Sequence, residues 1–382
     1  MSKVEITKIT DRTGSGAPNF TNGFNIAGAD SGISGFTHTE GSSEPSSPSN
    51  GDTWWDSGNN IYKVYMNNAW QDFLGTTPAS DVWGGTRGFQ FGGTTNLNNS
   101  TRNNSINYFD TTSAGNAVDF GDLTQAVKNS SAAGNGTRLL RMGGYVSGSP
   151  ARTDTIDYIT CATTGNAVDF GNLIEGVGLG ASASDGTYGI QVGGSRDGGP
   201  NNQIEYVTIA NAGNSTDFGD LLGDRIFHSA TNDKTRAMSM GGNSKLNNID
   251  YFTMATPGNA SDFGDLVAGT DNASNGTVSN DTRGLIMGGT DASNYRLNTI
   301  QYITIQTTGN ATDFGDLTIV KGYLSACSNE SGDKGFSIGG DSASSQSNVI
   351  DVVTISTAGN ATDFGDGLAT YTQGAGGSGN AS

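Results

Sequence analysis

Apolar and polar residues alternate along most of the chain beyond residue 80, and no stretch there follows the period of a helix. Segment 298–305 (NTIQYITI) is typical, because Ile300, Tyr302 and Ile305 stand among polar residues. The same pattern recurs in segments 105–109, 155–160, 203–209, 248–254 and 349–355. This alternation predicts short β-strands and an all-β chain.

The alternating segments belong to a repeat that has two markers. One marker, GNxxDF, starts at Gly115, Gly165, Gly213, Gly258, Gly309 and Gly359, in steps of 45 to 51 residues. The other is a Gly-Gly pair, which starts at Gly92, Gly143, Gly193, Gly241, Gly288 and Gly339. Each unit also holds a Ser/Ala-rich segment and a turn, so it predicts four short strands in about 50 residues.

The unit resembles the kelch repeat over residues 80–382. A GG pair closes the second strand, a tyrosine lies in the third strand, and an aromatic residue lies in the fourth. Where kelch blades usually carry Trp, this chain has Phe120, Phe170, Phe218, Phe263, Phe314 and Phe364. Val352 departs from the pattern, because it replaces the strand tyrosine of the last unit. The resemblance implies a six-bladed β-propeller.

The two ends of the repeat region predict how the propeller is closed. Residues 368–382 supply a first strand with nothing after it, and residues 83–93 begin with a second strand that lacks a first. Together they complete one blade, whereas a solenoid of the same units would need polar capping units instead. We therefore expect an all-β, six-bladed, kelch-like propeller that is closed by N- and C-terminal strands, with a small hairpin-rich module before it.

That module occupies the chain before the repeats. Residues 1–50 read as an extended attachment segment and linker, in which 4–9 is a strand, 18–26 a hairpin and 38–51 a Ser/Pro-rich linker. Residues 51–78 read as an aromatic β-hairpin module with three strands. The propeller is predicted to span 79–382.

Residues 51–73, with GDTWWD, a turn and an aromatic strand ending in AW, resemble segments of tail fibres and other virion structural proteins of tailed bacteriophages. The GNATDFGDL repeats are similar to those in structural proteins of marine phages, including cyanophages. This resemblance implies a virion component that is mounted through its N-terminal side. The aromatic residues expected to serve virion attachment are Phe20, Phe24, Trp54, Trp55 and Trp70.

Charge and composition narrow the function classes. The net charge of −18, without a basic run, argues against a nucleic-acid partner. Cys161 and Cys327 occupy non-equivalent places in the repeat and are expected to be buried, unpaired thiols. Neither an export signal nor an apolar stretch long enough to insert into a membrane is present, so we expect assembly in the host cytoplasm and release by lysis.

The DFG triplets can be interpreted either as chemical motifs or as residues that cap turns. Six copies without the other kinase motifs argue against a kinase. The aspartates Asp119, Asp169, Asp217, Asp262, Asp313 and Asp363 could bind structural calcium with Asp122 or Asp316. The alternative, which we favour, is that Asp and Asn cap tight turns. No cofactor or metal is therefore expected.

The chain offers little for catalysis. His38 and His228 are the only histidines, and neither a GxSxG motif nor a sialidase Asp box is present. Paired carboxylates for glycoside cleavage remain open among 37 acidic residues, but we expect no enzyme.

The turns of the repeat predict two different faces. On the constant face, the turns before the second strands carry Arg87, Arg138, Arg236, Arg283 and Lys334, with Tyr188 as the exception, and this cationic ring is expected to pair with the aspartates of GNxxDF. On the variable face lie the connections 96–105, 145–154, 195–202, 243–248 and 290–298, together with those between units. Recognition residues usually lie in such loops. Residues expected to contact a receptor are Arg102, Tyr145, Arg152, Arg196, Phe227, Tyr295 and Arg296.

These observations predict a non-catalytic tail fibre or tail-associated adhesin whose variable face binds a host surface glycan or protein. Its other partners would be virion proteins bound through the N-terminal module, and it would be a homo-oligomer or be present in several copies. The alternative is a structural decoration on the capsid or tail without a receptor role. A carbohydrate-active enzyme is the third reading.

Overall fold

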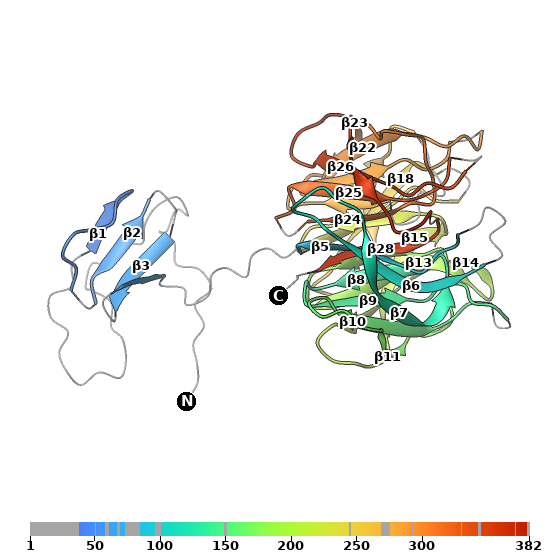
Figure 1. The fold of residues 1–382 in the computed structure, drawn as a ribbon, viewed down its shortest axis with the longest axis horizontal. Coiled ribbons are helices and arrows are strands. Elements are labelled where there is room, and N and C mark those ends of the chain that lie inside the picture. The colour runs from blue at the N-terminus through green and yellow to red at the C-terminus, as the bar shows by residue number, and fades with distance from the viewer. Residues whose placement is uncertain are drawn as a thin grey trace. The chain divides into compact units, whose positions relative to one another are not determined.

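The structure, a computed structural model, contains strands and turns and no helix among the residues it describes (Figure 1). These are residues 38–49, 51–57, 61–66, 69–72, 85–95, 101–148, 151–243, 246–268, 276–291, 293–329, 331–342, 345–370 and 372–379. The chain divides into two compact units, Met1–Ser80 and Asp81–Ser382, close to the predicted boundary at 78/79. The strand predicted at 4–9 and the hairpin predicted at 18–26, with Phe20 and Phe24, lie outside the described residues.

The first unit contains one four-stranded sheet in the order β1 (His38–Gly41), β2 (Thr53–Asp56), β3 (Ile61–Met66) and β4 (Ala69–Asp72). Strands β2 to β4 are antiparallel and confirm the three strands predicted in 51–78. The linker predicted at 38–51 is wrong at its start, because β1 pairs in parallel with β2. Composition missed β1 because strand pairing uses backbone groups, which even a polar segment supplies.

The second unit contains six sheets of four strands each, and consecutive strands within each sheet are antiparallel. The first strands are β8 (Ser131–Gly134), β12 (Ala181–Ser184), β16 (Ser229–Asn232), β20 (Thr277–Ser279), β24 (Ser325–Ser328) and β28 (Ala375–Gly379). The second strands are β9 (Arg138–Met142), β13 (Tyr188–Arg196), β17 (Arg236–Met240), β21 (Arg283–Met287), β25 (Lys334–Ile338) and β5 (Arg87–Phe91). The arrangement is consistent with a β-propeller-like fold.

The third and fourth strands complete each sheet. The third strands are β10 (Thr155–Thr160), β14 (Gly199–Thr208), β18 (Asn248–Thr253), β22 (Thr299–Thr304), β26 (Val349–Thr354) and β6 (Asn103–Asp110). The fourth strands are β11 (Val168–Asn172), β15 (Thr216–Arg225), β19 (Ser261–Asp265), β23 (Thr312–Asp316), β27 (Thr362–Asp366) and β7 (Val118–Val127). One sheet joins the two ends of this unit, because β28 pairs with β5, with Ala375 opposite Phe91.

The apolar core lies between neighbouring sheets. In one cluster, Phe89, Ile106 and Phe120 of one sheet pack with Leu139 and Ile159 of the next. The phenylalanines of GNxxDF are buried, and Phe120 meets Phe89 edge-on with ring centroids 5.1 Å apart. Each sheet therefore depends on its neighbour to bury its apolar face.

The GNxxDF marker joins sheets through hydrogen bonds rather than only capping its own turn. The backbone N–H of a residue in one sheet donates to the asparagine side chain of the next marker, at 3.0 or 3.1 Å. The pairs are Asp122–Asn166, Asn172–Asn214, Asp220–Asn259, Asp265–Asn310, Asp316–Asn360 and Asp366–Asn116. The local Asn cap expected from the sequence is therefore a contact between sheets.

The glycine after each marker phenylalanine lies where two sheets approach most closely. A Cβ on Gly121, whose φ is 153°, would lie 2.3 Å from the carbonyl oxygen of Gly165. A Cβ on Gly365 would lie equally close to the oxygen of Gly115, between the last marker and the first. This close approach explains why the marker reads DFG in all six units.

The Ser/Ala-rich first strands also bond to one another. The hydroxyls of Ser182 and Ser184 in β12 donate to the carbonyls of Ala132 and Gly134 in β8, at 2.6 and 2.7 Å. Thr277 in β20 donates in the same way to Ala230 in β16. Small side chains allow these strands to lie side by side, and their hydroxyls satisfy carbonyls that have no partner in their own sheet.

Candidate functional site

The variable connections lie together on one face, as predicted. Isolated bridges join four of the connections that follow a GG pair to a connection that leads into a first strand, as between Lys128 and Tyr145 or between Gly322 and Asp341. We use the name variable face for the surface formed by the described residues of connections 94–103, 143–154, 194–199, 242–248, 289–298 and 340–348, together with the described connections that lead into first strands. The structure describes all seven residues that the sequence proposed for receptor contact, and six of them are half-buried or exposed at this face.

Three of the four proposed arginines join neighbouring sheets. Arg102 donates to the carbonyl of Tyr145 at 3.2 Å. Arg152 stacks on the ring of Tyr145, donates to the hydroxyl of Ser195 at 2.9 Å and lies 3.5 Å from the Asp197 carboxylate. These half-buried guanidinium groups therefore connect neighbouring sheets and are also partly exposed at the surface.

Arg296 also joins neighbouring sheets, whereas the side chain of its neighbour Tyr295 is exposed. Arg296 forms a bidentate ion pair with Asp341 of the next sheet, donates to the Thr290 hydroxyl and stacks over the Tyr323 ring. Tyr295 is 71% exposed, more than any other large apolar side chain in the described part of the chain. Its backbone N–H donates to Asp291, so the exposed ring stands on an ordered turn.

The variable face has a half-buried aromatic pair beside Arg296. Phe227 and Tyr323 lie in two connections that lead into first strands, and their rings meet edge-on with centroids 6.2 Å apart. Both residues have positive φ angles, 57° and 53°, which non-glycine residues rarely adopt. Asn129, Leu179 and Gln373 hold the equivalent positions with similar angles.

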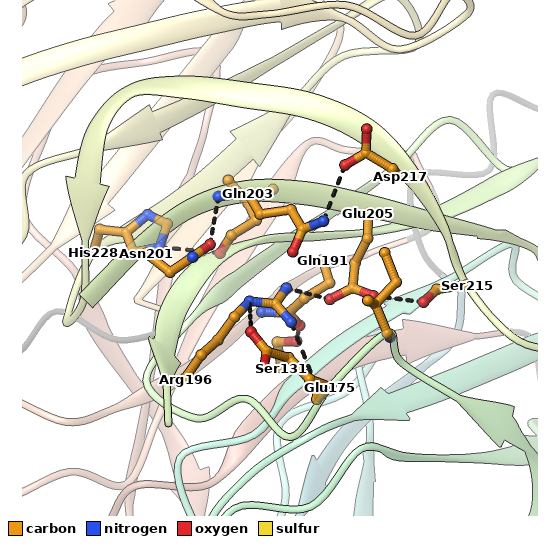
Figure 2. A network of polar contacts seen from close by, with 12 residues as sticks. Ser131, Glu175, Gln191, Arg196, Asn201, Gln203, Glu205, Ser215, Asp217 and His228 are labelled. Atoms are coloured by element: carbon orange, nitrogen blue, oxygen red, sulfur yellow. Dashed lines mark hydrogen bonds and ion pairs between the residues drawn. The ribbon is translucent and has the colours of Figure 1, made fainter. Parts of the chain in front are cut away.

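Arg196 does not lie in an exposed loop, contrary to the sequence prediction. β13 and β14 continue past the GG pair, with Arg196 opposite Gly199, so the predicted loop 195–202 is mostly a hairpin extension. The guanidinium is 2% exposed and forms an ion pair with buried Glu205, while its Nε lies 3.6 Å from Glu175 (Figure 2). Arg196 is therefore unavailable for contact with a surface ligand.

The Arg196–Glu205 pair belongs to a pattern of buried charges that the sequence analysis missed. The same position of the third strand carries a buried carboxylate in four sheets and an amide, Asn107 or Gln301, in the other two. Each carboxylate has one buried base: Arg141–Asp157, Arg196–Glu205, Arg225–Asp250 and Lys321–Asp351. Arg225 and Lys321 hold equivalent places in the repeat, whereas Arg141 and Arg196 come from two other places, so three-dimensional contact is needed to reveal the match.

All of these buried acids and amides except Asn107 are also bonded to the sheet before them. The Thr124 hydroxyl donates to Asp157 at 2.5 Å, and the backbone N–H of Val267 donates to Gln301 at 2.7 Å. These bonds satisfy oxygens that would otherwise be buried without partners, which is what makes a buried charge tolerable.

The cationic ring of the constant face does not pair with the marker aspartates as expected. Arg87 donates to the carbonyls of Cys161 and Ala162 in the next sheet, at 2.7 and 3.0 Å, and stacks on Tyr108 of its own sheet. The other three arginines of the ring, Arg138, Arg236 and Arg283, combine the same two contacts. These guanidinium groups therefore contact backbone carbonyls of the neighbouring sheet and a ring of their own sheet in place of the marker aspartates.

Of the two exceptions in the ring, only Lys334 comes with a change of its stacking partner. Tyr188, in place of an arginine, meets Tyr206 edge-on with centroids 5.1 Å apart. Val352 lies opposite Phe336, where other third strands have a tyrosine, and in that sheet the cation is Lys334. The aliphatic Val352 offers no ring for a guanidinium to stack on.

His228 is fully buried below the variable face. Burial lowers its pKa to about 3, and nearby Arg225 adds to this effect. Its Nε2 is 3.1 Å from the Val192 carbonyl and its Nδ1 is 2.8 Å from the Ser239 hydroxyl. Because a carbonyl can only accept, Nε2 carries the proton and Nδ1 accepts from Ser239. The neutral ring has a structural role.

In the first unit, two of the residues proposed for virion attachment, Trp54 and Trp70, belong to an aromatic cluster. Trp54 is buried and its indole N–H donates to the Gly41 carbonyl at 3.0 Å, which ties β2 to β1. The Trp70 ring lies 5.6 Å from Trp54 and 5.4 Å from Tyr65, and Lys63 lies over Trp54. Trp55, on the opposite side of β2, is half-buried. Two of the three tryptophans thus form the packing of this small sheet.

Chemistry-bearing groups are sparse in the described residues. No group of three or more His, Cys, Asp or Glu side chains there could hold a metal ion. Cys161 and Cys327 are buried and unpaired, as predicted, and burial raises the pKa of both thiols to about 12. No helix that could cross a membrane occurs in the described ranges.

No protein-family model matches the chain, and a search of curated proteins finds no match.

Proposed function

We propose that the second unit is a closed, six-bladed, kelch-like β-propeller. The contacts that join each sheet to the next also join the last sheet to the first: the Asp366 N–H donates to Asn116, and the Gly115 N–H donates to the Phe364 carbonyl at 3.1 Å. The pairing of β28 with β5 supports the same arrangement. In a closed ring, no sheet has to bury its apolar face alone.

We propose that this propeller is the host-binding part of a phage virion protein, a tail fibre or tail-associated adhesin that acts without catalysis. The observation that carries the proposal is the contrast between the two faces. The constant face repeats one set of bonds between sheets, whereas the variable face carries different connections on the same rigid frame and presents Tyr295. Exposed aromatic residues on ordered turns are frequent anchors in binding interfaces.

The binding test uses the purified chain and substitutes Tyr295 by alanine. Loss of this aromatic anchor is expected to weaken binding to host cells or isolated envelopes by roughly tenfold or more. A matched control is Val168→Ser, because Val168 is 55% exposed on the outer strand β11, away from the variable face. Binding that is absent in the parent chain, or equal in all three proteins, would contradict the adhesin proposal and favour a structural decoration.

A further inference from the structure

One buried ion pair of the second unit has a lysine where the other three have arginine. Lys321 lies five residues after the second aspartate of its DFGD segment, the place that Arg225 holds after its own segment. Its Nζ lies 2.9 Å from Oδ2 of Asp351 in β26, and the side chains are 0% and 1% exposed. The pair is therefore isolated from water, and its base is a primary amine.

The Asp351 carboxyl group is held by two different contacts. Its Oδ1 accepts a hydrogen bond from the Thr318 hydroxyl. Its Oδ2 faces Nζ but makes no aligned hydrogen bond to any described group. Nζ also donates to the Val349 carbonyl at 3.3 Å, which fixes the amine beside the carboxyl group.

The lysine can react where an arginine cannot. A guanidinium stays protonated in proteins, whereas an amine that loses its proton becomes a nucleophile. Burial lowers the pKa of Lys321, although the charges of Asp351 and Asp363 oppose this. Transfer of one proton from Nζ to Oδ2 gives a neutral amine beside a neutral carboxylic acid, which are the forms that condense.

We propose that Lys321 and Asp351 join in an intramolecular amide bond. The Nζ lone pair attacks Cγ, and the electron pair of the C=O bond moves to Oδ1, where the Thr318 hydroxyl stabilises the negative charge. When the C=O bond re-forms, the bond from Cγ to Oδ2 breaks. Oδ2 leaves as water with the proton it carried and one from Nζ, so no oxidant or other reactant is required.

The surroundings retain their remaining contacts after the reaction. Asp363, the cross-strand partner of Asp351, favours the protonated form of Lys321 through its charge and is not needed for the step. The product keeps one N–H, which can still donate to Val349. Fixed geometry favours this step, because the two reacting groups are already in contact.

The bond would tie the connection before β24 to β26. It removes a buried charge pair and shortens the loop that the unfolded chain can open, and both effects stabilise the folded state. This inference is independent of the proposed host-binding function, because it concerns only the interior of the second unit.

Mass spectrometry of the purified, denatured full chain tests the proposal. The expected mass is lower than the sequence mass by one water, about 18 Da. Trypsin should fail to cut after Lys321, so that residues 297–334 remain joined to residues 335–382, which contain Asp351. A full sequence mass with normal cleavage after Lys321, even after days at neutral pH, would overturn the proposal.

Two variants separate this bond from other losses of water. Lys321→Arg restores the kind of pair seen at Arg225 and should fold, as circular dichroism can check, but should show no mass loss beyond the substitution. Asp351→Asn should lose ammonia, about 17 Da, because the amide nitrogen then leaves in place of water. A water loss that persists in Lys321→Arg would place the reaction elsewhere and contradict the proposal.

Discussion

At the scale of single residues, the same residue type serves different purposes according to what surrounds it. Arg196 and Arg296 lie in equivalent connections of the sequence, yet Arg196 is buried against Glu205 and Arg296 is half-buried against Asp341. Each guanidinium offers several donors in one plane, so it can satisfy a carboxylate and neighbouring carbonyls together. The few cations of this acidic chain are thus largely used for internal contacts.

His228 leads to a prediction about pH. Its folded pKa of about 3 lies below its unfolded value of 6.5, so the unfolded chain binds the proton more tightly. The stability that His228 contributes is complete above pH 6.5 and is lost as the pH falls from 6.5 towards 3. We expect His228→Gln to flatten the pH dependence of the melting temperature in this range.

The control for this experiment is His38→Gln, which changes the only other histidine, in the separate first unit. It should leave the pH dependence of the second unit's melting transition unchanged. Equal slopes for the parent chain and His228→Gln would show that this ring is not responsible.

At the scale of elements, the residue types in a first strand such as β28 depend more on the room beside the neighbouring strand than on their intrinsic β-propensity. β28 has the sequence AGGSG, which is a weak strand by propensity. A Cβ on Gly376 would nevertheless lie only 2.4 Å from the backbone oxygen of Ala326 in the neighbouring first strand. Gly376 is therefore required by the close approach of two backbones.

Gly376→Ala tests this constraint. Because backbone atoms cannot move aside easily, we expect the substitution to lower the free energy of unfolding by about 1–3 kcal/mol, as overpacking does elsewhere. Gly213→Ala is the matched control, since nothing lies within 4 Å of its added Cβ. Urea unfolding measures both, and similar midpoints would show that β24 and β28 are not so close.

At the scale of the whole molecule, the second unit depends on contacts between sheets more than on any single sheet. Its apolar clusters and marker hydrogen bonds repeatedly join one sheet to the next, and so does the buried Arg225–Asp250 ion pair. Such contacts are shared, so the loss of one strand exposes apolar surface on its neighbours and leaves strand edges unpaired. Unfolding of this unit should therefore be cooperative.

Deletion of residues 372–382, which removes β28, tests this dependence. The loss of β5's partner should lower the melting temperature by at least several degrees and promote aggregation. Deletion of residues 380–382, which follow β28, is the control and should have little effect. A truncated chain that melts like the parent would contradict a closed arrangement.

The sequence by itself determined the strands, their grouping in fours and the complementary chain ends. Period-two alternation, GG pairs and GNxxDF are local signals that reflect backbone geometry, and each is repeated six times. The sequence also predicted that Cys161 and Cys327 are unpaired and that the variable connections share a face. It overlooked β1 because β1 pairs through its backbone and carries no apolar pattern.

Only the tertiary structure decided what the polar residues contact. In four sheets, a buried acid and its matching base are separated along the sequence by between 9 residues (Arg196–Glu205) and 30 residues (Lys321–Asp351). No single spacing in the sequence therefore identifies these pairs. For the same reason Arg196 could not be distinguished from an exposed loop residue such as Tyr295. Polar side chains are placed by their partners, and those partners are defined only when the sheets pack together.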